Sequence, residues 1–137
     1  MRKCVGLWID HKQAIIVSIA DGQEEIIHIE SGVEGRRRVS GGASSASRYG
    51  PQETASEKHM QERRKHQLSA YYHRVILAIR DAQSIFILGP AEAKIELRQE
   101  LRKSKELASR IAGTETADRM TENQIVAKVR QLFTPPG

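Results

Sequence analysis

The sequence predicts an α/β fold in which a mixed five-stranded sheet is flanked by helices. Three short runs rich in Ile and Val open the chain, with turn signals between them. Two helical patterns follow, each leading into another strand pattern, and a last helical pattern closes the chain. The order is therefore strand-strand-strand-helix-strand-helix-strand-helix. An antiparallel meander followed by right-handed crossovers onto parallel strands gives the strand order 3-2-1-4-5, a ribonuclease-H-like arrangement.

The first three strands are predicted from the runs CVGLWID, QAIIVSIA and EEIIHIES, at residues 4–10, 13–20 and 24–31. The segments Asp10–Gln13 and Asp21–Gln23 separate them, and the second contains the Asp-Gly pair typical of hairpins. Asp10 suits the first position of a tight turn, which is the interpretation we favour. These signals predict a meander in which each strand pairs with the next.

The long helix is predicted from Thr54 to Ala82, where apolar residues recur at helical spacing. This stripe consists of Leu68, Tyr72, Val75, Ile76 and Ile79. It covers only the second half of the helix. The first half reads SEKHMQERRKHQ and is polar on nearly every face. We therefore expect that half to project beyond the core.

The rest of the chain predicts a strand at Ser84–Pro90, a helix at Ala91–Ser104, a strand at Arg110–Asp118 and a helix at Thr121–Phe133. Ile95, Leu97 and Leu101 are expected apolar positions of the first of these helices. Thr121 and Gln124 have capping-box spacing at the start of the second. The Gly-Pro turn before residue 91 places Gly89 and Lys94 at a helix N-terminus, which makes them a candidate anion site.

A basic segment separates the meander from the long helix. Residues 35–74 hold nine Lys or Arg and three Glu, whereas the remainder holds 13 basic and 14 acidic residues, so this segment carries the whole excess of the +5 net charge. Its first part is a Gly- and Ser-rich loop at about 32–53, too long for an ordinary connection and expected to be flexible. A local field of this kind favours a polyanion such as RNA or an acidic membrane surface.

Composition narrows the other classes. The chain of 137 residues is expected to be one domain, 1–137, and its single cysteine allows no internal disulfide, which fits the cytoplasm. We expect no membrane span, no signal peptide, no cofactor and no metal site. His59, His66 and His73 are spaced seven apart, about 10 Å along a helix, which is too far to share one ion. They extend the basic face instead.

Two stretches together resemble a known family. The run SIFILGPAEAKIELRQEL is similar to a strand and helix in the central domain of eukaryotic and archaeal class I peptide-chain release factors and of Pelota. Gly89, Ala91, Glu92 and Lys94 are among the matching residues. Those release factors also carry a basic loop with a Gly-Gly-Gln tip before a long basic helix, as RRRVSGGASS precedes ERRKHQLSAYYHRVILAI here. The opening VGLWIDHKQAIIVSI resembles small bacterial translational machinery proteins.

The resemblance breaks down at the loop tip. Gly41 and Gly42 are followed by Ala43, where the release factors have the glutamine that acts in peptide release. A methyl group cannot donate or accept the hydrogen bonds of that glutamine. The resemblance therefore implies a basic tip that enters an RNA-lined site, without the release reaction.

These observations predict a non-catalytic RNA-binding protein, associated with ribosomal RNA or tRNA and with other translation proteins. The expected RNA-binding residues are Arg36, Arg37, Arg38, Gly41, Gly42, Arg48, Lys58, Arg63, Arg64 and Lys65. Two alternatives stay open. One is an enzyme, either a metal-dependent nuclease using Asp10 with Glu92 or Asp118, or a peptidyl-tRNA hydrolase-like protein. The other is a protein-interaction module.

Overall fold

The computed structural model describes residues 3–33 and 50–133, with the backbone alone for residues 50–56. It confirms the predicted α/β fold, with one mixed sheet in the order β3-β2-β1-β4-β5. Antiparallel pairs join β1 to β2 and β2 to β3, whereas β4 is parallel to both β1 and β5. The strands are β1 (Lys3–Ile9), β2 (Gln13–Ala20), β3 (Gln23–Glu30), β4 (Ser84–Gly89) and β5 (Ile111–Thr116).

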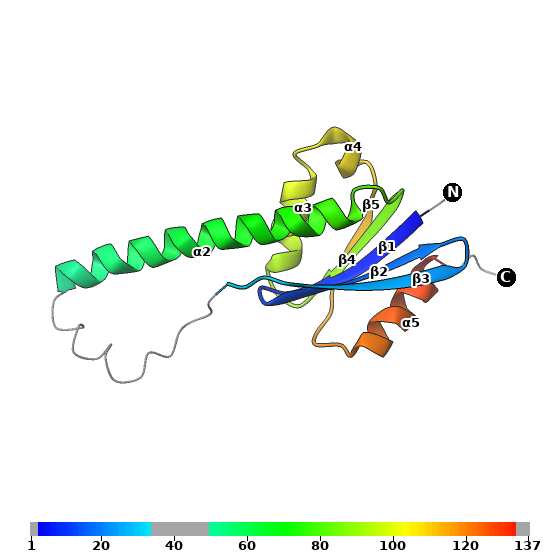
Figure 1. The fold of residues 1–137 in the computed structure, drawn as a ribbon, viewed down its shortest axis with the longest axis horizontal. Helices are drawn as coiled ribbons and strands as arrows, with labels where there is room; N and C mark the ends of the chain where they lie inside the picture. Colours follow the sequence, from blue (N-terminus) through cyan, green and yellow to red (C-terminus); the bar gives the residue numbers. More distant parts are fainter. Residues whose placement is uncertain (1–2, 34–49, 134–137) are drawn as a thin grey trace.

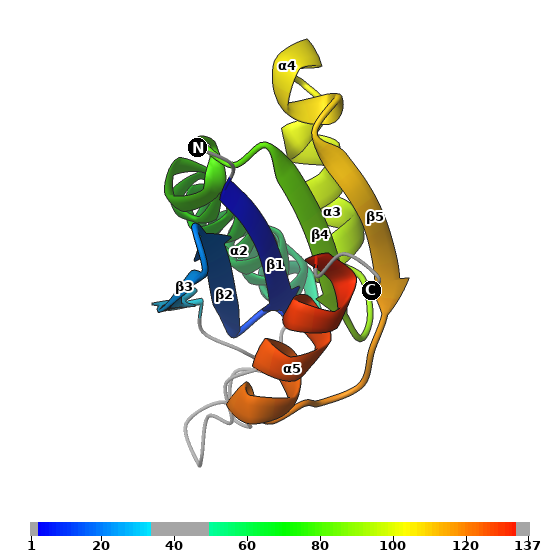
Figure 2. The same cartoon turned by 90° about the vertical axis from the view of Figure 1, so that its right-hand side faces the viewer.

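The described helices cover both faces of the sheet. Their bounds are α2 (Gly50–Ile79), α3 (Ala93–Leu101), α4 (Lys105–Ala108) and α5 (Glu122–Phe133). Helices α2 and α3 lie on one face and α5 lies on the other (Figures 1 and 2). The central strand β1 is consequently buried on both sides, with Val5, Leu7 and Ile9 packed in the larger core and Trp8 in the smaller core against α5.

The predicted apolar stripe of α2 is the contact that fixes this helix on the sheet. Tyr72, Val75 and Ile79 are buried, as expected, and Tyr71 is buried beside them. Leu68 and Ile76 are partly buried at the margin of the same core. Full burial of one such side chain contributes about 1.5–3 kcal/mol, so this stripe supplies most of the attachment of α2.

Several boundaries differ from the prediction. Helix α2 begins at Gly50, so the end of the loop predicted at 32–53 is helical. Pro51 lies in the first turn, where its missing N–H leaves no hydrogen bond unmade. The helix predicted at Ala91–Ser104 is shorter, because Ser104 caps the separate turn α4 by accepting a hydrogen bond from the Leu107 amide. Ile95, expected in the core, is 38% exposed.

Two local predictions are confirmed in detail. The Asp10 carboxylate closes the turn after β1 by accepting hydrogen bonds from the amides of Lys12 and Gln13, both at 2.8 Å. At the start of α5, the Thr121 amide donates to the Gln124 side chain at 2.9 Å, and the Gln124 amide donates to the Thr121 hydroxyl at 3.1 Å. This reciprocal pair is a capping box, which fixes where α5 begins.

Substitution of Gly89 by Ala should destabilise the protein. A Cβ atom at this position would lie 2.3 Å from the Ile9 carbonyl oxygen, which is backbone of the neighbouring strand and cannot rotate away. Overpacking of this kind costs about 1–3 kcal/mol. We therefore expect Gly89→Ala to lower the urea midpoint of unfolding by that equivalent.

Gly22→Asn is the matched control for this experiment. Gly22 has a positive φ of 78°, and a Cβ there meets nothing within 4 Å. Asn tolerates the left-handed conformation, so the free energy of unfolding should change by about 0.5 kcal/mol or less. Equal loss of stability in the two variants would show that the β1–β4 contact at Gly89 is not tight.

Candidate nucleic-acid interface

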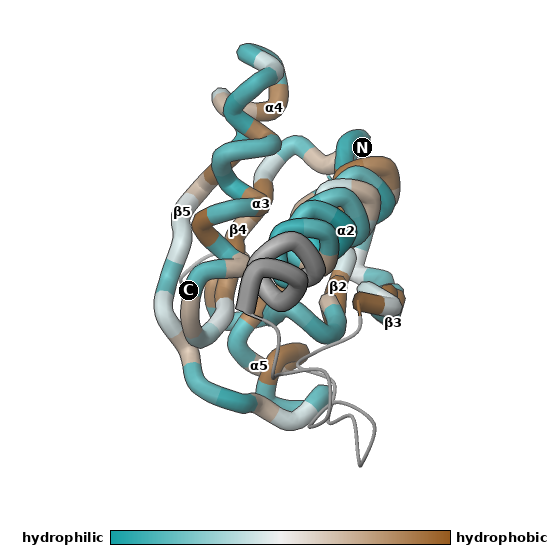
Figure 3. Tube along the Cα trace, turned by 90° about the vertical axis from the view of Figure 1, so that its left-hand side faces the viewer, coloured by the Kyte–Doolittle hydropathy of each residue, from teal (hydrophilic) through white to brown (hydrophobic). Residues whose placement is uncertain are grey.

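The N-terminal half of α2 extends beyond the edge of the sheet (Figure 1). From Glu57 to Gln67 no side chain is buried, whereas the buried stripe starts at Tyr71. The positions that would continue this stripe are polar, since Arg64 lies seven residues before Tyr71 on the same helical face. Seen end-on, this part of the helix is hydrophilic around its circumference (Figure 3). The prediction of a projecting polar helix end is confirmed.

The projecting half carries four of the predicted RNA-binding cations. Lys58, Arg63 and Lys65 are exposed, and Arg64 is half-buried. None of the four forms an ion pair with another described residue. Glu57 and Glu62 are the acidic residues of this segment, so its net charge is positive. The cations are therefore available to an external anion.

Histidines add to this surface. His59, His66 and His73 are all exposed on α2. No cluster of His, Cys, Asp or Glu in residues 3–33 or 57–133 is arranged to hold a metal ion. In particular, Asp10 uses one carboxylate oxygen to close its turn. The histidines gain charge as the pH falls, which strengthens the positive field of the helix under acidic conditions.

The remaining predicted RNA-binding residues lie outside the described residues. These are Arg36, Arg37, Arg38, Gly41, Gly42 and Arg48. The point at which their segment leaves the sheet is nevertheless described. Ser31 is buried, its amide donates to the Lys12 carbonyl at 2.8 Å, and its own carbonyl accepts from the Arg74 guanidinium at 3.2 Å. Arg74 thus anchors this exit point to α2, 6.0 Å from the centre of the Tyr71 ring.

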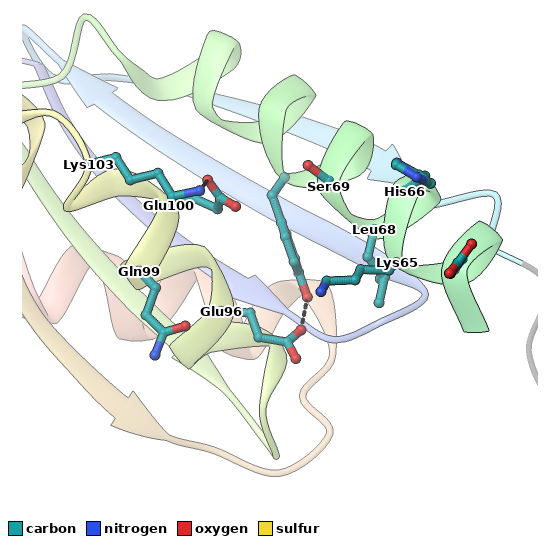
Figure 4. A pocket seen from close by; sticks show the side chains of 10 residues that line it. Lys65, His66, Leu68, Ser69, Glu96, Gln99, Glu100 and Lys103 are labelled. Carbon is teal, nitrogen blue, oxygen red and sulfur yellow. Dashed lines mark hydrogen bonds and ion pairs between the residues drawn. The ribbon is translucent and has the colours of Figure 1, made fainter. Parts of the chain in front are cut away.

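A groove of about 850 Å³ separates the middle of α2 from α3 (Figure 4). Lys65, His66 and Tyr72 line it from α2, and Glu96, Glu100 and Lys103 line it from α3. Lys103 and Glu100 form an ion pair at 2.9 Å. The groove therefore presents both signs of charge, in contrast to the cationic projecting helix.

At the floor of this groove, three elements meet on one carboxylate. Glu96 Oε1 accepts a hydrogen bond from the Tyr72 hydroxyl at 2.5 Å and lies 3.0 Å from His11 Nε2. Burial raises the pKa of the Tyr72 hydroxyl above its usual range, and the hydrogen bond to Glu96 raises it further. Burial likewise raises the pKa of Tyr71, with a smaller contribution from the charge of Asp10. This cluster ties α2, α3 and the β1–β2 turn together.

The candidate anion site at Gly89 and Lys94 has a more specific local structure than its sequence indicates. The lack of a side chain at Gly89 is required by the close approach of the Ile9 carbonyl. Lys94 is buried at 7% exposure, and its ammonium donates to the Ala91 carbonyl at 2.5 Å. Both residues therefore have structural work in the β4–α3 turn, and an anion-binding role for them stays a prediction.

The groove and the cluster on Glu96 were not predicted from the sequence. Tyr72 was assigned only to the apolar stripe, and Glu96 only to an exposed position of a helix. One signal was present, because a buried tyrosine hydroxyl usually finds a hydrogen-bond partner. The identity of that partner depends on how α2 crosses α3, which no local pattern encodes.

Replacement of Tyr72 by Phe should change the pH dependence of stability. In the unfolded chain a tyrosine loses its proton near pH 10, whereas in the folded protein Tyr72 keeps it to higher pH. The stabilising contribution is thus complete below about pH 10 and is lost as the pH rises above it. Tyr72→Phe should reduce the alkaline fall in the free energy of unfolding by about 1.4 kcal/mol per pH unit. Urea unfolding across this range measures the slope, and identical slopes in both proteins would contradict the assignment.

Amide hydrogen exchange should divide α2 into two parts. An isolated helix shorter than about 12–15 residues is marginal in water, and the projecting half has no packed face to stabilise it. Amides from Glu57 to Gln67 should exchange at least about 100-fold faster than those from Tyr71 to Ile79. Exchange measured by mass spectrometry on peptides from both halves tests this, and uniform protection along α2 would contradict a free-standing half.

Comparison with known proteins relates this architecture to proteins of translation. The sequence matches no protein-family model and no curated protein. Among solved structures, archaeal translation termination factor aRF1 superposes with a TM-score of 0.61 at 10% identity, over 97% of this chain and 35% of that one. Pelota of Archaeoglobus fulgidus has a TM-score of 0.56 at 12% identity, over 97% and 32% of the two chains.

Pelota of Thermoplasma acidophilum also matches, with a TM-score of 0.56 at 16% identity over 95% of this chain and 32% of that one. This chain therefore spans about one third of the length of each of these structures. At such low identity the likeness is one of fold. The predicted resemblance is confirmed at that level: the chain has the fold of a part of aRF1 and of Pelota.

Proposed function

We propose that this protein is a non-catalytic RNA-binding protein of translation, which binds ribosomal RNA or tRNA through its basic helix end and the preceding loop. The observation that carries the proposal is the projecting half of α2, which has exposed, unpaired cations and packs on nothing among the described residues. Such a helix end is stabilised when a polyanion neutralises its charges. The proposed place of action is the bacterial cytoplasm.

The character of the helix favours RNA over a membrane surface. A helix that lies in a membrane interface needs an apolar face with residues such as Trp, Phe or Leu. From Glu57 to Gln67 the sequence offers only Met60 as a large apolar residue. In addition, none of the described helices is long and apolar enough to cross a membrane. Phosphate groups, which require only cations, are the better match.

The fold supports a role in translation. One of the similar structures is a translation termination factor, and this chain corresponds to about a third of it. In this proposal the loop arginines Arg36, Arg37, Arg38 and Arg48 continue the basic helix, and Gly41 and Gly42 let the tip approach RNA closely. Ala43 follows them, so the proposal includes no peptide release. Other translation proteins are further candidate partners.

Ribosome co-sedimentation tests the helix directly. In the test variant, Lys58, Arg63 and Lys65 are all changed to Gln, which removes three exposed cations. The protein should sediment with ribosomes at low salt, and the variant should do so less. Each lost phosphate contact on single-stranded RNA lowers the salt dependence, so the slope of log affinity against log salt should fall by about two.

The control variant changes Arg80, Arg102 and Lys105 to Gln, which removes the same charge from exposed positions away from the projecting helix. It should bind as the unaltered protein does. A further variant with Arg36, Arg37, Arg38 and Arg48 changed to Ala tests the loop separately. Lack of co-sedimentation at low salt, or equal weakening by the helix and control variants, would overturn the proposal.

A further inference from the structure

A second cavity lies at the end of the sheet, on the α5 side of the β1–β2 turn. It has a volume of about 440 Å³ and is lined by Trp8, Asp10, Lys12, Pro90, Arg119 and Met120, among others. These residues come from the segments that follow β1, β4 and β5. Because these three strands are parallel, their carboxyl ends meet at the same edge. That edge is the usual location of ligand sites in open α/β sheets.

The walls of this cavity are held in place from several sides. The Trp8 indole N–H donates to the Asp118 carbonyl at 3.1 Å, and the Ala117 amide donates to the Gly89 carbonyl at 2.9 Å. These two bonds pin the connection that carries Arg119 and Met120 against the ends of β1 and β4. The Asp10 carboxylate fixes the opposite wall. The cavity is therefore preformed, as small-molecule sites usually are.

The charged groups at the mouth are available to a ligand. Lys12 and Arg119 are exposed and form no ion pair with another described residue. Asp10 uses Oδ1 for the turn, and its recorded hydrogen bonds leave Oδ2 unused. Two cations can hold a phosphate, and the carboxylate oxygen can accept a hydrogen bond from a ribose hydroxyl or a base amino group.

The remaining wall is apolar and flat enough for a ring. Pro90 and Met120 are half-buried, and the edge of the Trp8 indole lies behind them. Inorganic phosphate would leave this surface unused, and it would fill only a small part of the cavity. A base stacked on apolar and aromatic side chains, with its phosphate on Lys or Arg, uses both kinds of wall.

We propose that this cavity binds one nucleotide of an RNA strand, with its phosphate between Lys12 and Arg119 and its base against Pro90 and Met120. The inference deepens the proposed function but depends on different residues. The Lys12 carbonyl receives the amide of Ser31, where the basic segment leaves the sheet. A strand that contacts this segment would therefore pass close to the cavity.

The test uses adenosine 5′-monophosphate as the probe and the fluorescence of Trp8 as the readout. Trp8 is the single tryptophan of the chain, so a change in emission reports on this cavity alone. We expect a saturable change with the mononucleotide. Arg119→Gln and Lys12→Gln should each weaken binding by about tenfold, because each removes one charge-assisted contact. Arg102→Gln, an exposed cation at the end of α3, should leave binding unchanged.

Separate titrations with inorganic phosphate and with adenosine divide the site into its two halves. Both should bind more weakly than the mononucleotide. Equal affinity for inorganic phosphate would overturn the proposal in favour of a bare anion site. Amide chemical shifts of Lys12, Gln13 and Arg119 provide a second readout, and no saturable change in either would also overturn it. Since no residue of α2 lines the cavity, either failure leaves the proposed role of the basic helix standing.

Discussion

The burial of Tyr71, Val75 and Ile79 against the sheet is the contact on which the rest of the arrangement depends. All three side chains have no exposed surface, and they hold the C-terminal half of α2 across the central strands. The direction in which the other half projects follows from this attachment. Arg74, which lies within the same stretch, then anchors Ser31 and so fixes where the basic segment leaves β3.

The positive charge and the packed core are consequently separated along one helix. The stripe that faces the sheet is apolar from Leu68 onward, whereas the equivalent positions before it carry charge. A helix that is polar on all sides gains little from the protein itself, and it is poised to gain from an anionic partner. The second cavity opens near the same end of the sheet, where Lys12 and Arg119 add cations from other elements (Figure 1).

The parts that could be predicted from sequence are those set by local patterns. Strand alternation located β2 to the residue, and the Thr121–Gln124 spacing located the start of α5. The parts that could not be predicted depend on long-range packing. Glu96 meets Tyr72 and His11 because α2, α3 and the β1–β2 turn converge, and Ile95 is exposed because α3 presents Leu97 and Leu101 to the core instead.

Cross-linking of the protein to ribosomes, followed by identification of the linked peptides, tests the central claim most directly. The account predicts RNA cross-links on peptides that contain residues 57–67 of α2, with weaker labelling of α4 and of the exposed face of β3. Ribosome-bound protein that cross-links to RNA through α4 or β3, with none on the projecting helix, would contradict the account.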